Sequence, residues 1–61
     1  MATVGPDDRV IDLGTGDGRI LISAARDRGA SGLGVDLDPV LIRRARRNAE
    51  REGVGNRVAF R

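Results

Sequence analysis

Three glycines at every second position, flanked by acids, are the residues of this chain best suited to bind a small molecule. Gly14, Gly16 and Gly18 follow an apolar run that ends at Leu13, and an apolar run of helical length comes after them. This order predicts a strand that turns tightly into a helix. Glycine lets a ligand approach the backbone, and the amides at a helix N-terminus favour a negative group. The alternative is an ordinary strand-to-helix loop without a ligand.

A second acid, Asp36, follows the next predicted strand and is expected at the same crevice as the glycine turn. Its carboxylate can accept hydrogen bonds from both hydroxyls of a ribose, and its charge disfavours a 2′-phosphate. Turn and acid together predict a nucleoside site, with a solvated loop acid as the alternative for Asp36. Leu37 either rests on a flat ring or packs against the protein, and Asp38 before Pro39 is expected to cap a helix.

The residues around the turn argue against a dinucleotide. The dinucleotide fingerprint has Gly or Ala where this chain has Arg19, and a bulky arginine there is expected to obstruct close packing of the helix on the strand. Asp12 and Asp17 would repel a pyrophosphate, whereas both favour a ligand that carries a cation and an amino group. A unit that binds NAD is therefore the less favoured alternative.

The rest of the chain alternates between strands and helices that would position these residues. Strands are expected at Arg9–Leu13, Leu33–Asp36 and Val58–Phe60, and helices at Arg19–Arg28 and Pro39–Glu52. Such alternation predicts a parallel sheet. Right-handed crossovers place the strands in the order 3-2-1 with both helices on one face. The expected fold class is α/β, a Rossmann-like βαβαβ half-unit.

A half-unit of this kind leaves one face of its sheet bare. A buried parallel sheet needs cover on both faces, and residues 1–61 offer nothing to cover the second face or to pair with the edge of strand Arg9–Leu13. We therefore expect a partial domain. The bare face and the open edge also favour an alternative role, a non-catalytic nucleoside-binding module that associates with itself or with another chain.

Composition removes several other classes of function. The 61 residues include no cysteine and no histidine, which excludes disulfides, removes the commonest general base and leaves few zinc ligands. We therefore assign no metal site and no catalytic residue. Phe60 is the only aromatic residue, so base stacking on single-stranded nucleic acid loses support.

The charge and hydropathy of the chain show neither a nucleic-acid signature nor a membrane-spanning pattern. All 11 basic residues are arginines, against 9 acids, and the formal charge is +2. The arginines within residues 43–51 are interpreted as a solvated helix face, in which Glu50 can pair with Arg46 or Arg47. No apolar run approaches the roughly 20 residues that span a membrane, and residues 1–6 lack the features of a signal peptide. A cytoplasmic location is the default.

Two motifs together resemble the N-terminal half of a class I S-adenosylmethionine-dependent methyltransferase. The family's acid-x-Gly-x-Gly-x-Gly motif is similar to residues 12–18, its second motif to residues 34–39, and its second helix to residues 42–49. The resemblance extends over residues 4–61. It implies the family's seven-stranded sheet, of which this chain would hold only the 3-2-1 side, so that strands four to seven are absent.

The resemblance also implies S-adenosylmethionine as cofactor and a role for each matching position. The residues that would bind it are Asp12, Gly14, Thr15, Gly16, Gly18, Asp36 and Leu37. The glycines would line its methionine part, Asp12 would receive the amino group, Asp36 the ribose hydroxyls, and Leu37 the adenine. In the family, the absent half largely positions the acceptor. The acceptor therefore stays open, and the isolated chain is expected to be inactive.

Overall fold

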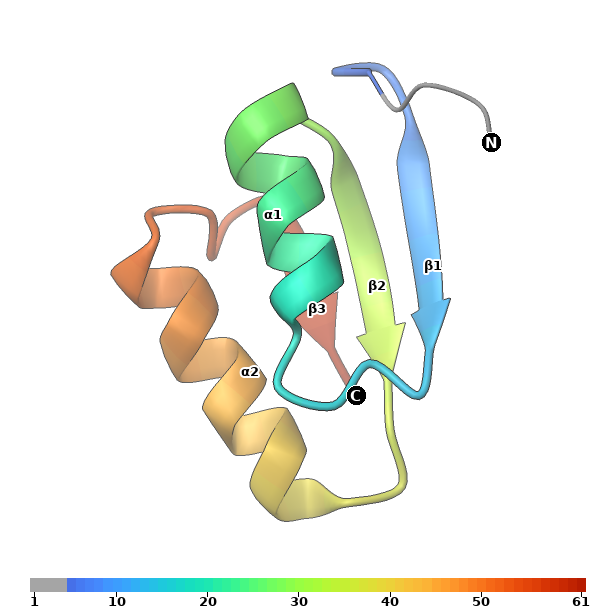
Figure 1. Cartoon of the computed structure of the whole chain (residues 1–61), viewed down its shortest axis with the longest axis vertical. Helices are drawn as coiled ribbons and strands as arrows, with labels where there is room; N and C mark the ends of the chain where they lie inside the picture. The colour runs from blue at the N-terminus through green and yellow to red at the C-terminus, as the bar shows by residue number, and fades with distance from the viewer. Residues whose placement is uncertain (1–4) are drawn as a thin grey trace.

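Strands and helices alternate along the chain in the computed structural model, which describes residues 5–61 (Figure 1). The elements are β1 (Arg9–Leu13), α1 (Arg19–Arg28), β2 (Ser31–Val35), α2 (Pro39–Arg51) and β3 (Val58–Phe60). Residues 1–4, part of the segment judged above for signal-peptide features, lie outside the described residues. No helix in the described part of the chain is long and apolar enough to cross a membrane.

The three strands form one parallel sheet with β2 in the middle and β1 and β3 as its neighbours. In the register, Ile11 lies opposite Leu33, which in turn lies opposite Ala59. Both helices cover the same face of the sheet (Figure 1). The predicted fold class and strand order are confirmed.

The middle strand starts two residues earlier than predicted, at Ser31, and ends one residue earlier, at Val35. Serine and glycine have a weak preference for strands, which is why the sequence pattern missed residues 31–32. The Ser31 amide donates to the Asp8 carbonyl at 3.2 Å, and the Gly32 amide donates to the Arg57 carbonyl at 3.0 Å. Hydrogen bonds toward both sides therefore impose the extended backbone on these two residues.

Helix α2 begins as its sequence predicts. The Asp38 carboxylate accepts a 2.9 Å hydrogen bond from the Val40 amide, and Pro39 occupies the first helical position. The predicted helix cap is therefore confirmed. The helix ends at Arg51, one residue earlier than expected, with Glu52 as its C-terminal cap.

The hydrophobic core lies between the helices and one face of the sheet. Its members are Leu21, Ile22, Ala25, Ile42, Ala45, Ala49, Val54, Val58 and Phe60. Gly34 of β2 allows the close approach on this side, because a Cβ there would lie 2.7 Å from the Phe60 ring. On the opposite face, Ile11 and Leu13 are 70% and 78% exposed. Residues 5–61 thus leave that face uncovered.

Candidate cofactor-binding site

The glycine turn and the loop after β2 meet at the carboxyl ends of the strands, at the lower edge of the molecule in Figure 1. The amides of Gly14 and Thr15 both donate to the Val35 carbonyl, at 2.8 and 2.9 Å. The Gly16 amide donates to the Asp36 Oδ2 atom at 2.9 Å. The structure therefore brings together the two motifs that the sequence singled out, although 20 residues separate Gly16 from Asp36.

Asp36 is more than a solvated loop acid. Its Oδ1 atom accepts a second hydrogen bond, at 2.9 Å, from the Asp38 amide. The amides of Asp38 and Gly16 hold the pKa of Asp36 below its ordinary value, so the side chain is a carboxylate at neutral pH. A carboxylate offers about four lone-pair sites. The two backbone amides occupy two of them, which leaves acceptor capacity for two further donors.

The glycines of the turn divide into two kinds. Gly14 and Gly16 have φ angles of 73° and 57°, and an added Cβ at either would have no atom within 4 Å. Their outer sides are thus open. Gly18 has a φ of 80°, and a Cβ there would lie 2.7 Å from the Phe60 ring and 3.0 Å from the Ala45 methyl group. The side of Gly18 on which a Cβ would lie faces the core. Gly18 would therefore contact a cofactor only through its backbone.

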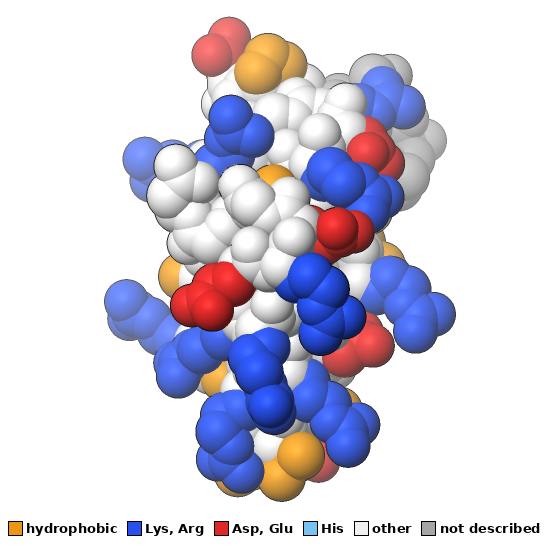
Figure 2. Space-filling model, turned by 90° about the vertical axis from the view of Figure 1, so that its left-hand side faces the viewer, with side chains coloured by type: hydrophobic (Ala, Val, Ile, Leu, Met, Phe, Trp, Pro, Cys, Tyr) orange, Lys and Arg blue, Asp and Glu red, His pale blue; other side chains and the backbone are white. Residues whose placement is uncertain are grey.

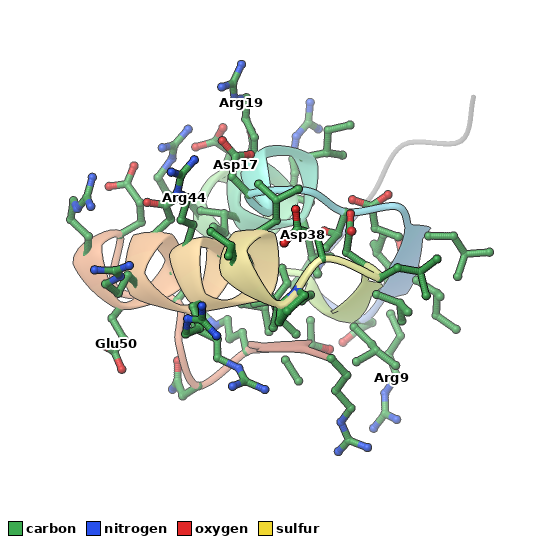
Figure 3. All side chains as sticks on the ribbon, turned by 90° about the horizontal axis from the view of Figure 1, so that it is seen from below. Arg9, Asp17, Arg19, Asp38, Arg44 and Glu50 are labelled. Carbon is green, nitrogen blue, oxygen red and sulfur yellow. The ribbon has the colours of Figure 1, made fainter. Side chains whose placement is uncertain are left out.

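The prediction that the Arg19 side chain obstructs close packing of α1 on the sheet is wrong. The Arg19 side chain is 86% exposed and forms a 3.5 Å ion pair with Asp17, so it does not enter the contact between helix and sheet. Gly18, one position earlier, supplies that close contact. The Asp17 carboxylate also accepts from the Arg19 amide at 3.3 Å. Figure 3 shows both side chains beside the start of α1.

The other predicted site residues differ in exposure. Leu37 is fully exposed, which rules out packing against the described part of the chain. A cleft of about 370 Å³ opens beside Asp36 and Leu37 and is bordered by α2. The Thr15 side chain is buried next to Gly34, and its Oγ1 atom has no hydrogen-bond partner among residues 5–61. Asp12 is half-buried near the end of β1.

Two long-range contacts of α2 were missed by the sequence analysis. The Asn48 side chain donates to the Asp17 carbonyl at 3.1 Å, and the Arg46 guanidinium donates to the Phe60 carbonyl at 2.8 Å. The only local signal was an asparagine, a weak helix former, in the middle of a helix. Both contacts join segments that are remote in sequence, so spacing along α2 could not reveal them.

The basic surface of α2 consists of exposed arginines, namely Arg43, Arg44, Arg46, Arg47 and Arg51. Figure 2 shows arginine side chains spread over this side of the molecule. The predicted pairing of Glu50 is wrong, because no ion pair of Glu50 forms within residues 5–61. Arg44 and Glu50 lie on opposite sides of the helix (Figure 3). Arg46 instead contacts the end of β3.

The fold and the glycine-and-acid site are those of a Rossmann-like cofactor-binding unit. Comparison with known families identifies the unit further: the methyltransferase domain matches residues 5–61, and the chain belongs to this family. The match includes the turn, Asp36 and all five elements. It decides between the alternatives in favour of the methyltransferase resemblance and against an NAD-binding unit.

Several relatives of known class are similar to this chain. The ribosomal protein L11 methyltransferase of Thermus thermophilus is 51% identical over 49 residues, which are 80% of this chain and 19% of that protein. A protein-lysine N-methyltransferase of Saccharolobus islandicus is 45% identical over 61 residues, which are 98% of this chain and 38% of that protein. The chain thus spans less than two fifths of the length of either relative.

Solved structures agree with the family assignment. The crystal structure of an RNA methyltransferase from Salinibacter ruber in complex with S-adenosyl-L-homocysteine matches with a TM-score of 0.93 and 52% identity, over 95% of this chain and 38% of that one. A methyltransferase from Geobacter sulfurreducens with the same ligand matches with a TM-score of 0.91 and 42% identity, over 93% of this chain and 23% of that one. S-adenosylmethionine is therefore the cofactor of the family. The individual residues that would contact it in this chain remain predictions.

Proposed function

We propose that this chain is the S-adenosylmethionine-binding portion of a methyltransferase. The observation that carries the proposal is the 2.9 Å hydrogen bond from the Gly16 amide to the Asp36 carboxylate. It joins the turn after β1 to the acid after β2. In open α/β sheets, ligands bind in the crevice outside the carboxyl ends of the strands, and both residues lie there. Membership of the methyltransferase domain family supports the same function.

The nucleoside half of the cofactor fits the loop after β2. Asp36 has acceptor capacity for two donors beyond its two backbone partners, and a ribose offers two hydroxyl donors. Leu37, fully exposed next to Asp36, offers an apolar surface for the adenine ring. Covering this side chain would favour binding, because it removes apolar surface from water.

The methionine half fits the glycine turn. The open sides of Gly14 and Gly16 leave room for a ligand against the backbone. The backbone of Thr15 and Gly18 would line the same side of the ligand. Asp12, half-buried just before the turn, is suited to receive the amino group. The negative charge of Asp12 would also attract the positive sulfonium group, whereas the charge of Asp17 is balanced by its ion pair with Arg19.

The cofactor supplies an electrophilic methyl group, and this chain would bind and orient it. Methyl transfer further needs an acceptor nucleophile held in line with the sulfur–carbon bond. No residue of the chain is assigned to that task, so we infer that the isolated chain transfers no methyl group. The relatives named above act on a ribosomal protein, on protein lysine and on RNA, and this diversity leaves the acceptor open.

Calorimetric titration tests the cofactor site directly. S-adenosylhomocysteine and NAD are titrated separately into the wild type, into Asp36→Asn and into Asp7→Asn. The Asp7 variant removes the same charge from an exposed turn remote from Asp36. We expect only S-adenosylhomocysteine to bind, and Asp36→Asn to weaken it by about 10- to 100-fold through loss of charged hydrogen bonds. Circular dichroism of each sample verifies that the variants are folded.

Two results would contradict the proposed site. One is tighter binding of NAD than of S-adenosylhomocysteine, and the other is an equal loss of affinity in the folded Asp7 and Asp36 variants. The inactivity of the isolated chain is tested separately, with radiolabelled S-adenosylmethionine and a mixture of protein and RNA acceptors. Transfer of label by the purified chain would refute that part of the proposal.

A further inference from the structure

The glycine turn is held from three directions. From β2 and the loop after it, the Val35 carbonyl and the Asp36 carboxylate accept hydrogen bonds from the amides of Gly14, Thr15 and Gly16. From β3, the Phe60 ring lies against Gly18. From α2, the Asn48 side chain donates a 3.1 Å hydrogen bond to the Asp17 carbonyl across 31 residues of sequence. Of these three sets of contacts, only the contact from α2 is a hydrogen bond donated to the turn by a side-chain amide.

We propose that Asn48 is a positioning residue for cofactor binding, because its hydrogen bond fixes the backbone of the glycine turn. This inference rests on the proposed function, since it deepens the role of the same turn. Asn48 would not touch the cofactor. It acts through the Asp17–Gly18 peptide, whose carbonyl it holds.

The geometry of that peptide explains how one side chain can set the turn. In a planar trans peptide, the carbonyl and the following N–H point in opposite directions. The Asp17 carbonyl points to Asn48, and the Gly18 amide donates to the Thr15 carbonyl at 2.9 Å. The two bonds together hold the peptide plane from both ends. Without the Asn48 donor the plane keeps one anchor, and the turn is less well organised before the ligand arrives.

The choice of residue at this helix position supports a role outside the helix. Asparagine is a weak helix former, and alanine would favour α2 itself. Asn48 is half-buried, precedes the core residue Ala49 in the sequence, and reaches the turn with its side chain. The helix thus carries a residue that is unfavourable for its own conformation and that satisfies a carbonyl of the turn.

The test compares Asn48→Asp and Asn48→Ala with the wild type and with Asn56→Ala. Asn48→Asp keeps the shape but loses the donor. Asn56 is an exposed asparagine in the turn before β3 and serves as the matched control. Two quantities are measured: the affinity for S-adenosylhomocysteine, and amide hydrogen exchange at Gly16 and Gly18, whose N–H groups are hydrogen-bonded in this structure. Urea unfolding of each variant gives its global stability.

We expect both Asn48 variants to bind S-adenosylhomocysteine about ten-fold more weakly and to exchange the Gly16 and Gly18 amides faster at similar global stability. Asn56→Ala should resemble the wild type. Unchanged exchange in both Asn48 variants would overturn the proposal, and this result needs no ligand. Faster exchange with unchanged affinity would also overturn it. If the wild type itself fails to bind, the proposed function fails for the isolated chain, while the exchange measurement still decides whether Asn48 sets the turn.

Discussion

At the scale of single residues, Gly16 and Gly18 should respond differently to the same substitution. Alanine at either position adopts a left-handed conformation, which costs roughly 1–2 kcal/mol. At Gly18 the new methyl group would also lie 2.7 Å from the Phe60 ring, and overpacking adds roughly 1–3 kcal/mol. We therefore expect Gly18→Ala to lower the free energy of unfolding more than Gly16→Ala in urea denaturation. Equal losses would show that the contact with Phe60 relaxes without cost.

The titration of Asp36 should make the fold sensitive to acid. Hydrogen bonds from the amides of Asp38 and Gly16 lower its pKa in the folded chain. Its contribution to stability is therefore complete above the unfolded value of about 3.9 and is lost as pH falls through the folded pKa. We expect the urea concentration at the unfolding midpoint of the wild type to decrease as the pH is lowered below about 4. The midpoint of Asp36→Asn should decrease less over the same pH range. Parallel curves for the two proteins would exclude this role for Asp36.

Residue types predicted part of the site and gave no information on the rest. Gly16 and Asp36 were singled out because each has a chemistry of its own, an open backbone and a free carboxylate. The sequence predicted that these two residues lie near each other, but not that a hydrogen bond joins them. The contact of Asn48 with the Asp17 carbonyl could not be predicted, because the order of polar residues along α2 does not show which of them meets the turn. Which residue of α2 meets the turn depends on how Ala45 of this helix packs against Gly18.

At the scale of elements, the start of α2 depends on one side chain. Asp38 is the N-terminal cap and accepts from the Val40 amide. We expect Asp38→Ala to lower the free energy of unfolding by about 1 kcal/mol, and Asp38→Asn to be nearly neutral, because asparagine caps equally well. Urea denaturation measures both. The cap argument fails if the asparagine variant loses as much stability as the alanine variant.

The bounds of helix α1 were predictable from local signals, whereas the predicted start of strand β2 was wrong because tertiary hydrogen bonds decide it. Helix α1 starts and ends at the expected residues, and Gly29 takes a left-handed conformation with a φ of 72° at its end. Strand β2 starts earlier than expected because the Ser31 and Gly32 amides find partners in the Asp8 and Arg57 carbonyls. Apolar periodicity carries no information on such partners, which lie far apart in sequence.

At the scale of the whole molecule, the two faces of the sheet differ in their cover. One face packs against both helices, while Ile11 and Leu13 on the other are largely exposed. The register places Ile11 beside Leu33 and Leu13 beside Val35, so the apolar side chains of neighbouring strands form one surface. Contiguous apolar surface exposed to water favours association. The outer edge of β1 has no strand partner within residues 5–61 and adds unpaired backbone groups beside it.

We therefore expect the isolated chain to associate with itself at micromolar concentrations, through this face or the β1 edge. Sedimentation velocity over a concentration series measures the association. Ile11→Lys should shift it toward monomer, because it places a charge in the middle of the surface. Ile20→Lys is the matched control, since Ile20 is 71% exposed on α1, outside this face. A monomer at every concentration would refute self-association.

The same pair of variants separates self-association from cofactor binding. The glycine turn and Asp36 lie at the carboxyl ends of the strands, whereas Ile11 lies in the middle of β1 on the face away from the helices. A charge at Ile11 should therefore leave the affinity for S-adenosylhomocysteine unchanged while it weakens association. A loss of affinity in Ile11→Lys but not in Ile20→Lys would show that the bare face must be covered before the turn adopts its binding conformation. Cofactor binding would then depend on whatever covers that face.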